Sequence, residues 1–513
     1  MNNANGIKKI VAKAASALGY EVLVIYNQSI QKPDSTTFLM IKSCAGRSII
    51  CFGETVPDDL LGDETSIEYN DKPLKVKICP CIHENAVSIR KIFKWTAPQY
   101  AGLKTSFGAG DRIGLATPGH IRALKNYDIF PVLAQQSIRE MSRTIRSAEE
   151  VMDDAIWGVF QEGYTGGFGS DADHLKTEQD IKSTVDAGFT GFTIDPSDHI
   201  NNDADKVNLN ELEDLFSGLF DEKDELLEFT GKYAGVDIVI KSKDRDLPIL
   251  INAEQLKRLA VKYLPAIRFT IWGYYLIKRL KGDEPFDFEM SVDETETPTT
   301  VAAHYMIANE LTLAGVKLTS LAPRFVGEFQ KAIDYIGDPD EFRNQLKDHV
   351  AVAGFFGQYK LSIHSGSDKF SIFPIVNQVT GGYFHEKTAG TSYLEALRVV
   401  CRYAPNLFRE IMKFALDQFE KERFSYHITT DFSRIPRLEK LADSQLEVLL
   451  NGNDSRQVLH VTFGATLTAT TKNDEYLFRD RILDVIDEHE DEHYKVLNKL
   501  FCAHLDAFVI NKK

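Results

Sequence analysis

Two aspartate–histidine pairs stand out among the residues that can do chemistry. Asp173-His174 lies in the segment GSDADH and Asp198-His199 lies in PSDH, each where a short strand is predicted to end. A neutral imidazole is a good ligand for a divalent metal, and an aspartate beside it is placed to move a proton on a metal-bound substrate. The two pairs predict a divalent metal site at strand ends, with the second pair held in reserve.

Two other segments resemble metal motifs but lack part of the pattern. Residues 489–493 read HEDEH, which matches the H-E-x-x-H pattern of zinc proteases. Six of the nine residues 484–492 are acidic, and His504 is the only later histidine, so we interpret this segment as an exposed acidic helix. The run CPCIH (79–83) is followed by no second cysteine pair, and it belongs to a predicted apolar strand.

The glycine-rich segment FGAGDRIG (107–114) is the candidate for a dinucleotide loop. Such a loop needs a helix directly after the glycines, because the phosphate binds at the helix N-terminus. Here ATPG follows at once, and the helix is predicted to begin only around Thr117. We interpret the segment as a glycine-rich strand end and keep Asp111, Arg112 and His120 as candidates to line a site.

The elements that must position these residues alternate along the chain. Helices such as 304–315 and 326–337 are predicted between short strands, and this alternation indicates a parallel sheet, open or closed. Residues 1–95 are predicted to form a small α/β unit, and 96–513 the main α/β part, with a helical insertion near 201–230 and C-terminal helices. The predicted strands of the main part include 129–135, 188–195, 286–293, 316–322, 359–366 and 458–465.

Composition narrows the class of partner. The 513 residues carry a net charge of −16, which disfavours nucleic acid and anionic membranes as partners. There is no run of about 20 apolar residues and no recognisable signal peptide, and the six cysteines form no disulfide framework. We expect a cytoplasmic protein that acts on a small molecule. Its oligomeric state is not predictable from these features.

The stretch 169–199 resembles class II, metal-dependent aldolases. Those barrels carry an Asp-His pair, then a helix and a strand of the form DAGF…ID, and later a strand that ends in histidine, here KLSIHSGSDKF with His364. They also take a ligand from a strand in between. The matching segment LTSLAPRFVGEF has no histidine, and Glu328 is its candidate.

Residues from about 105 to 400 resemble the tagaturonate epimerase family of hexuronate catabolism. The motifs that carry this resemblance are FGAGDRIGLATPGH, GSDADHLKTEQDI, SVDETETPTTVAAHY, LAPRFVGEFQKAIDYIGD, IHSGSDKFSIFP and HEKTAGTSYLEALR. The resemblance implies a TIM-type (β/α)8 barrel, a divalent cation (Zn, Mn, Ni or Co) and the interconversion of D-tagaturonate with D-fructuronate.

These resemblances assign roles to individual residues. We predict His174, Glu328 and His364 as metal ligands, and Asp173 as one proton-transfer group. The second proton-transfer group would be Glu289 or Glu294, since strand parity leaves the choice open. The residues predicted to bind substrate are Asp111, Arg112, His120, Lys176, Arg324, Ser365, Lys369 and His385.

The reaction itself restricts the mechanism. The two keto-acids differ at C3, counted from the carboxylate, whereas the ketone at C5 acidifies only the hydrogens on C4 and C6. Two routes remain: transient oxidation, which needs a nicotinamide, or retro-aldol cleavage of C3–C4 followed by re-addition, which needs a metal and a base. Direct proton exchange at C3 is a third possibility. Alternative functions are a class II-type aldolase, a sugar isomerase on the same barrel, and a non-catalytic sugar-acid binding protein.

Overall fold

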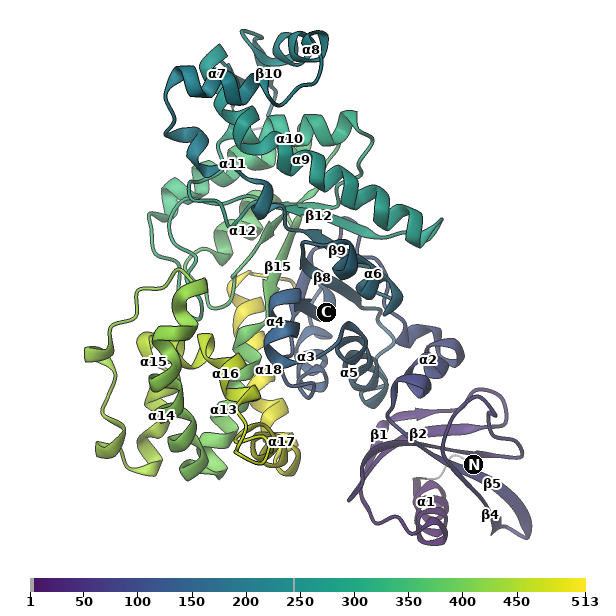
Figure 1. The fold of residues 1–513 in the computed structure, drawn as a ribbon. Coiled ribbons are helices and arrows are strands. Elements are labelled where there is room, and N and C mark those ends of the chain that lie inside the picture. Colours follow the sequence, from purple (N-terminus) through teal and green to yellow (C-terminus); the bar gives the residue numbers. More distant parts are fainter. Residues whose placement is uncertain (1–3, 243–244) are drawn as a thin grey trace.

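The centre of the molecule is a closed barrel of parallel strands (Figure 1). A computed structural model describes residues 4–242 and 245–513. The barrel confirms the predicted TIM-type fold, and its last strand pairs with its first, since His385–Thr388 runs parallel to Ser106–Ala109. In chain order its strands are β6 (Ser106–Ala109), β7 (Phe130–Ser137), β8 (Gly169–Leu175), β9 (Gly191–Ile194), β12 (Asp287–Ser291), β13 (Ser320–Ala322), β14 (Lys360–Ile363) and β15 (Phe384–Thr388).

Helices cover the outside of the barrel and bury its apolar outer face. A helical insertion with a short hairpin separates β9 from β12 (Figure 1, top). The covering helices are α3 (Thr117–Leu124), α4 (Ile138–Thr144), α5 (Ala148–Gln161), α6 (Glu178–Asp186), α9 (Ala253–Lys281), α10 (Val301–Leu313), α11 (Pro339–Phe355) and α12 (Phe373–Thr380). The insertion contains α7 (Leu209–Ser217), α8 (Lys223–Tyr233), β10 (Ile238–Ile240) and β11 (Leu247–Ile249).

The C-terminal helices form a second apolar core beside the barrel (Figure 1, green to yellow). They are α13 (Gly390–Tyr403), α14 (Pro405–Glu422), α15 (Asn453–Val461), α16 (Phe463–Thr468), α17 (Arg479–Glu488) and α18 (Glu490–Ala507). No helix within residues 4–242 and 245–513 is long and apolar enough to cross a membrane.

Two predicted elements are wrong. Residues 458–465 are helical, not a strand, because the run is buried on all sides and periodicity cannot separate a buried helix from a buried strand. Residues 326–337 form an irregular loop instead of a helix, and Glu328 pairs with Ile336 in an isolated bridge. The barrel strand missed by the sequence analysis is β15, whose sequence FHEKT is polar.

The N-terminal residues form an antiparallel sheet in the order β1-β2-β3-β5-β4. Its elements are α1 (Ala4–Leu18), β1 (Val22–Gln31), β2 (Thr37–Ser43), β3 (Gly46–Gly53), β4 (Asp63–Tyr69) and β5 (Lys72–Pro80), and α2 (His83–Ile92) leads to the barrel. Glu490 joins this sheet to the C-terminal helices, because its carboxylate accepts hydrogen bonds from Tyr26 Oη at 2.9 Å and Arg47 Nη2 at 2.8 Å.

The HEDEH segment is not one exposed acidic helix. α17 ends at Glu488 and α18 begins at Glu490, so the helix breaks at His489. The imidazole of His489 stacks on Tyr403, while His493 is fully buried. In the described part of the chain, neither histidine belongs to a cluster of potential metal ligands.

The interior of the barrel is charged. The Lys387 ammonium on β15 lies 2.8 Å from Asp171 Oδ2, 2.9 Å from Asp173 Oδ1 and 2.9 Å from Glu289 Oε1. Burial lowers the pKa of Lys387, but these three carboxylates outweigh burial and hold it well above its usual value. Burial raises the pKa of Asp171 and Glu289, whereas Lys387 and a neighbouring histidine lower both below the ordinary range. One cation therefore faces carboxylates from two strands of the barrel, β8 and β12.

We predict that Lys387→Met destabilises the protein by about 3–5 kcal/mol at neutral pH, because it leaves buried carboxylates without a counter-charge. Without Lys387, burial raises the pKa values of these carboxyl groups, so the variant protonates them near pH 4 and is relieved of the buried charge, whereas the wild type keeps Asp171 and Glu289 ionised there because their folded pKa values lie well below the ordinary range. The difference between variant and wild type should therefore shrink in acid, as measured by urea unfolding at pH 7 and near pH 4.

Lys360→Met is the matched control. Lys360 is also buried inside the barrel, but its ammonium donates to Ser106 Oγ and the Lys104 carbonyl and has no carboxylate within ion-pair distance among the described residues. We expect a smaller loss for this variant at pH 7. An equal loss for Lys387→Met at both pH values would contradict the charge-balance account.

Candidate active site

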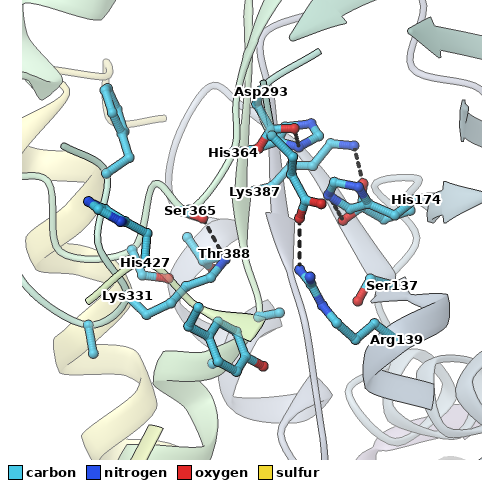
Figure 2. Close-up of a pocket in the computed structure, with 18 of the residues that line it drawn as sticks. Ser137, Arg139, His174, Asp293, Lys331, His364, Ser365, Lys387, Thr388 and His427 are labelled. Carbon is cyan, nitrogen blue, oxygen red and sulfur yellow. Dashed lines mark hydrogen bonds and ion pairs between the residues drawn. The ribbon is translucent and has the colours of Figure 1, made fainter. Parts of the chain in front are cut away.

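A cavity of about 350 Å³ opens at the C-terminal ends of the barrel strands. Asp173 and His174 from β8, His364 after β14 and Lys387 from β15 face it, and residues from the C-terminal part of the chain, such as His460, close another side. Figure 2 shows His174, His364 and Lys387 together on one side, with Lys331 and His427 on the other. This is the end of a TIM barrel where active sites lie.

Asp195 holds His174 in place. The β8–β9 pairing shifts register between Ala172 and Leu175, and His174 adopts a left-handed φ of 57°, unusual for a residue with a side chain. Its Nδ1 lies 3.0 Å from Asp195 Oδ2, and its Nε2 lies 3.7 Å from Asp173 Oδ2. Burial lowers the pKa of His174, but Asp173 and Asp195 outweigh it and raise the pKa to about 9.

His364 lies between two acids, Glu289 on β12 and Asp293 just after that strand. Its Nε2 is 2.7 Å from Glu289 Oε1, and its Nδ1 is 3.3 Å from Asp293 Oδ1 but has no hydrogen-bond partner. Burial lowers the pKa of His364, yet Asp293 and Glu289 raise it to about 10. The rings of His174 and His364 meet edge to face, with centroids 5.2 Å apart.

These side chains fit a divalent metal. Asp173, His174 and His364 each offer a ligand atom within 4.8 Å of the others, and so do His174, Asp195 and Glu294. Two imidazole nitrogens with carboxylate oxygens suit Zn²⁺, Mn²⁺, Co²⁺ or Ni²⁺. The carboxylate behind each histidine orients its ring, as outer partners of metal-binding histidines commonly do.

Other predicted residues also reach the cavity. Arg112, Glu294, Arg324, Ser365 and Glu328 line it. Glu328 belongs to neither group of potential ligands, and its Oε2 lies 2.9 Å from His427 Nε2. Glu294 Oε1 lies 3.1 Å from Arg139 Nη2. Glu289 lies deeper, behind His364, and contacts Lys387.

Several residues predicted to bind substrate lie outside the cavity lining. The Asp111 carboxylate accepts three backbone N–H groups and shapes the loop before α3. His120 contacts Ser392, and Lys369 donates to three backbone carbonyls. His385 lies deeper in the barrel, against Ser106.

Asp198 and His199, the reserve pair, lie with Lys176 in a separate group beyond the end of β9. Lys176 donates to Ser197 and Asp198. His199 stacks on Phe269, and Asp198 is largely exposed. Neither member of the reserve pair belongs to a potential ligand group in the described residues.

Sequence reasoning missed several cavity residues. Asp293 was findable, because Glu289, Ser291 and Asp293 share the parity that points into the barrel. Lys387 and His385 are two residues apart on β15, so their side chains point to the same side of the strand, into the barrel. The polar sequence of β15 hid this strand from the sequence analysis. Arg139, Lys331, His427 and His460 also line the cavity, and they come from helices or loops where spacing carries no signal.

Comparison with known proteins places the chain in a family. Residues 26–508 match the family described as tagaturonate epimerase. A tagaturonate/fructuronate epimerase from Thermotoga maritima is 41% identical over 489 residues, which are 95% of this chain and 97% of that protein.

Solved structures give the same result. The native crystal structure of a fructuronate-tagaturonate epimerase from Cohnella laeviribosi superposes with a TM-score of 0.89 at 39% identity, covering 98% of this chain and 100% of that one. A glycerol complex of that enzyme gives 0.89 at 38% identity, covering 98% and 99%. With its family match, its relative and its barrel in agreement, the chain belongs to the tagaturonate epimerase family.

Proposed function

We propose that this protein interconverts D-tagaturonate and D-fructuronate with the aid of a divalent metal ion. The observation that carries the proposal is the cluster of Asp173, His174 and His364 at the catalytic end of the barrel, in a chain of the tagaturonate epimerase family. A cavity of about 350 Å³ suits a ligand the size of a six-carbon sugar acid.

The two histidines are the proposed nitrogen ligands. They come from separate strands, and each ring is oriented by a carboxylate. Asp195 contacts Nδ1 of His174, and Glu289 contacts Nε2 of His364. Glu328, the third predicted ligand, faces His427 and belongs to neither potential ligand group, so we propose that Asp195 or Glu294, which form such a group with His174, supplies the oxygen ligand. A divalent ion bound there would supply Lewis-acid polarisation of the substrate ketone.

Retro-aldol chemistry is the route that these residues serve best. Asp173 takes the proton of the C3 hydroxyl, the C3–C4 bond breaks, and C3 becomes an aldehyde while the electron pair moves into an enediolate over C4 and C5. Rotation about C2–C3 presents the other aldehyde face, the C3–C4 bond re-forms, and Asp173 returns the proton. Lys387 holds the Asp173 carboxylate throughout, because its ammonium lies 2.9 Å from Oδ1.

We expect turnover to depend on the metal. Chelation should abolish epimerisation of D-tagaturonate, and Zn²⁺, Mn²⁺, Co²⁺ or Ni²⁺ should restore it; full activity in metal-free enzyme would contradict the proposal. Calorimetry gives a second readout. His174 and His364, with pKa values raised to about 9 and 10, are protonated at pH 7 without metal. Because a histidine must be deprotonated and neutral to bind a metal, binding should release protons and tighten as pH rises towards 9.

Asp173→Asn should abolish epimerisation while the metal stays bound. Asparagine keeps the size of the side chain but cannot accept a proton, and loss of a general base costs about 10²–10⁴ in rate. The test measures kcat, metal content and melting temperature on one preparation. A near wild-type kcat would refute the role of base, whereas joint loss of metal and activity would make Asp173 a ligand.

A further inference from the structure

Most cations that line the cavity already face a carboxylate. Arg112 pairs with Glu140, Arg139 with Glu294 and Lys387 with three acids, and His427 lies beside Glu328. Among the described residues, no carboxylate lies within ion-pair distance of Lys331 or Arg324. The site therefore keeps two cations for which the protein itself provides no counter-ion.

Lys331 is the better placed of these two cations. Its Nζ donates to Ser365 Oγ, and Ser365 directly follows the proposed ligand His364 (Figure 2). The Arg324 guanidinium, in contrast, donates to the Thr295 carbonyl and is tied to the loop after β12. Both residues line the cavity, but only the Lys331 ammonium binds a side chain next to the metal cluster.

The backbone around Lys331 and Ser365 is held firmly. Ser365 has a left-handed φ of 53°, and a Cβ on the next residue, Gly366, would lie 1.4 Å from Glu386 Oε1, so any side chain there would require the buried Glu386 carboxylate to move. The segment that carries Lys331 is also held, because Lys369 donates a hydrogen bond of 2.7 Å to the carbonyl of Gln330, the residue before Lys331. The ammonium is thus positioned before any ligand arrives.

We propose that Lys331, together with Ser365, binds the C1 carboxylate of the sugar-acid substrate. A half-buried ammonium without a counter-ion costs free energy, and its partial withdrawal from water lowers the pKa of Lys331. A bound carboxylate removes that cost, so the site favours an acid over a neutral ketose. This inference rests on the proposed function, since it names the part of the substrate that this side of the cavity holds.

The same contact explains how an epimerase differs from an aldolase. Cleavage of C3–C4 gives an aldehyde fragment with C1 to C3, which keeps the carboxylate, and a fragment with C4 to C6. The aldehyde fragment must rotate about C2–C3 without leaving the cavity. An ion pair at C1 holds the end of the fragment while its aldehyde turns, so both fragments are rejoined instead of released.

Lys331→Met tests the inference, because methionine keeps most of the length and removes the charge. We expect KM for D-tagaturonate to rise about 10- to 100-fold, the usual range for a lost charge-assisted hydrogen bond. Metal content should be unchanged and the melting temperature equal or higher, since a half-buried charge without a carboxylate partner is removed. The variant should also release dihydroxyacetone, the C4–C6 product, into solution. Lys331→Arg should retain most of the affinity.

Two further variants make the outcome decisive. Lys317→Met, at an exposed lysine before the N-terminal end of β13 and therefore at the opposite end of that strand from the cavity, should behave as wild type. Unchanged KM in Lys331→Met, with a large rise in Arg324→Met, would overturn the inference and assign the carboxylate to Arg324. Raised KM without any fragment release would overturn the retention role. Wild-type enzyme that fails to epimerise D-tagaturonate would instead refute the proposed function.

Discussion

The contact of one ammonium with three carboxylates organises this site. Lys387 lies between Asp171, Asp173 and Glu289 inside the barrel, and its single positive charge offsets part of the repulsion among these three buried or half-buried carboxylates. Glu289 in turn contacts His364, while Asp173 faces His174. The position of each proposed metal ligand therefore depends on a charge balance set one layer deeper in the barrel.

The C-terminal helices give the other half of the cavity its shape. Arg456 on α15 pairs with Asp368 at 2.6 Å and donates to the Ala332 carbonyl at 3.1 Å. His504 on α18 accepts a hydrogen bond from the Asp368 N–H. These contacts hold the loop after β13, which carries Lys331, against the loop after β14, which carries Ser365. The barrel thus supplies the metal side of the site, and the added helices fix the side proposed to bind the carboxylate.

The sequence was informative where local chemistry and strand periodicity agree. Asp173, His174 and His364 could be found because polar residues at the ends of apolar strands are conspicuous, and the barrel could be inferred from alternation and resemblance. Lys387 and β15 escaped because a polar inward face looks like a loop when the carboxylates that balance it lie on strands far away in the sequence, Asp173 being 214 residues from Lys387. Lys369 and His120 illustrate the opposite error, a polar residue that was predicted to bind substrate but lies outside the cavity lining. Lys369 donates to backbone carbonyls and His120 contacts a serine, and no local sequence pattern reveals these partners.

In the proposed reaction the enzyme breaks and re-forms the C3–C4 bond instead of moving a proton at C3. Carbon isotope effects on D-tagaturonate, measured at natural abundance at each position, test this claim most directly. Retro-aldol cleavage predicts normal primary ¹³C effects at both C3 and C4, because both atoms lose a bond in the same step. An effect at C3 alone, accompanied by uptake of solvent deuterium at C3, would contradict the account and indicate direct proton exchange.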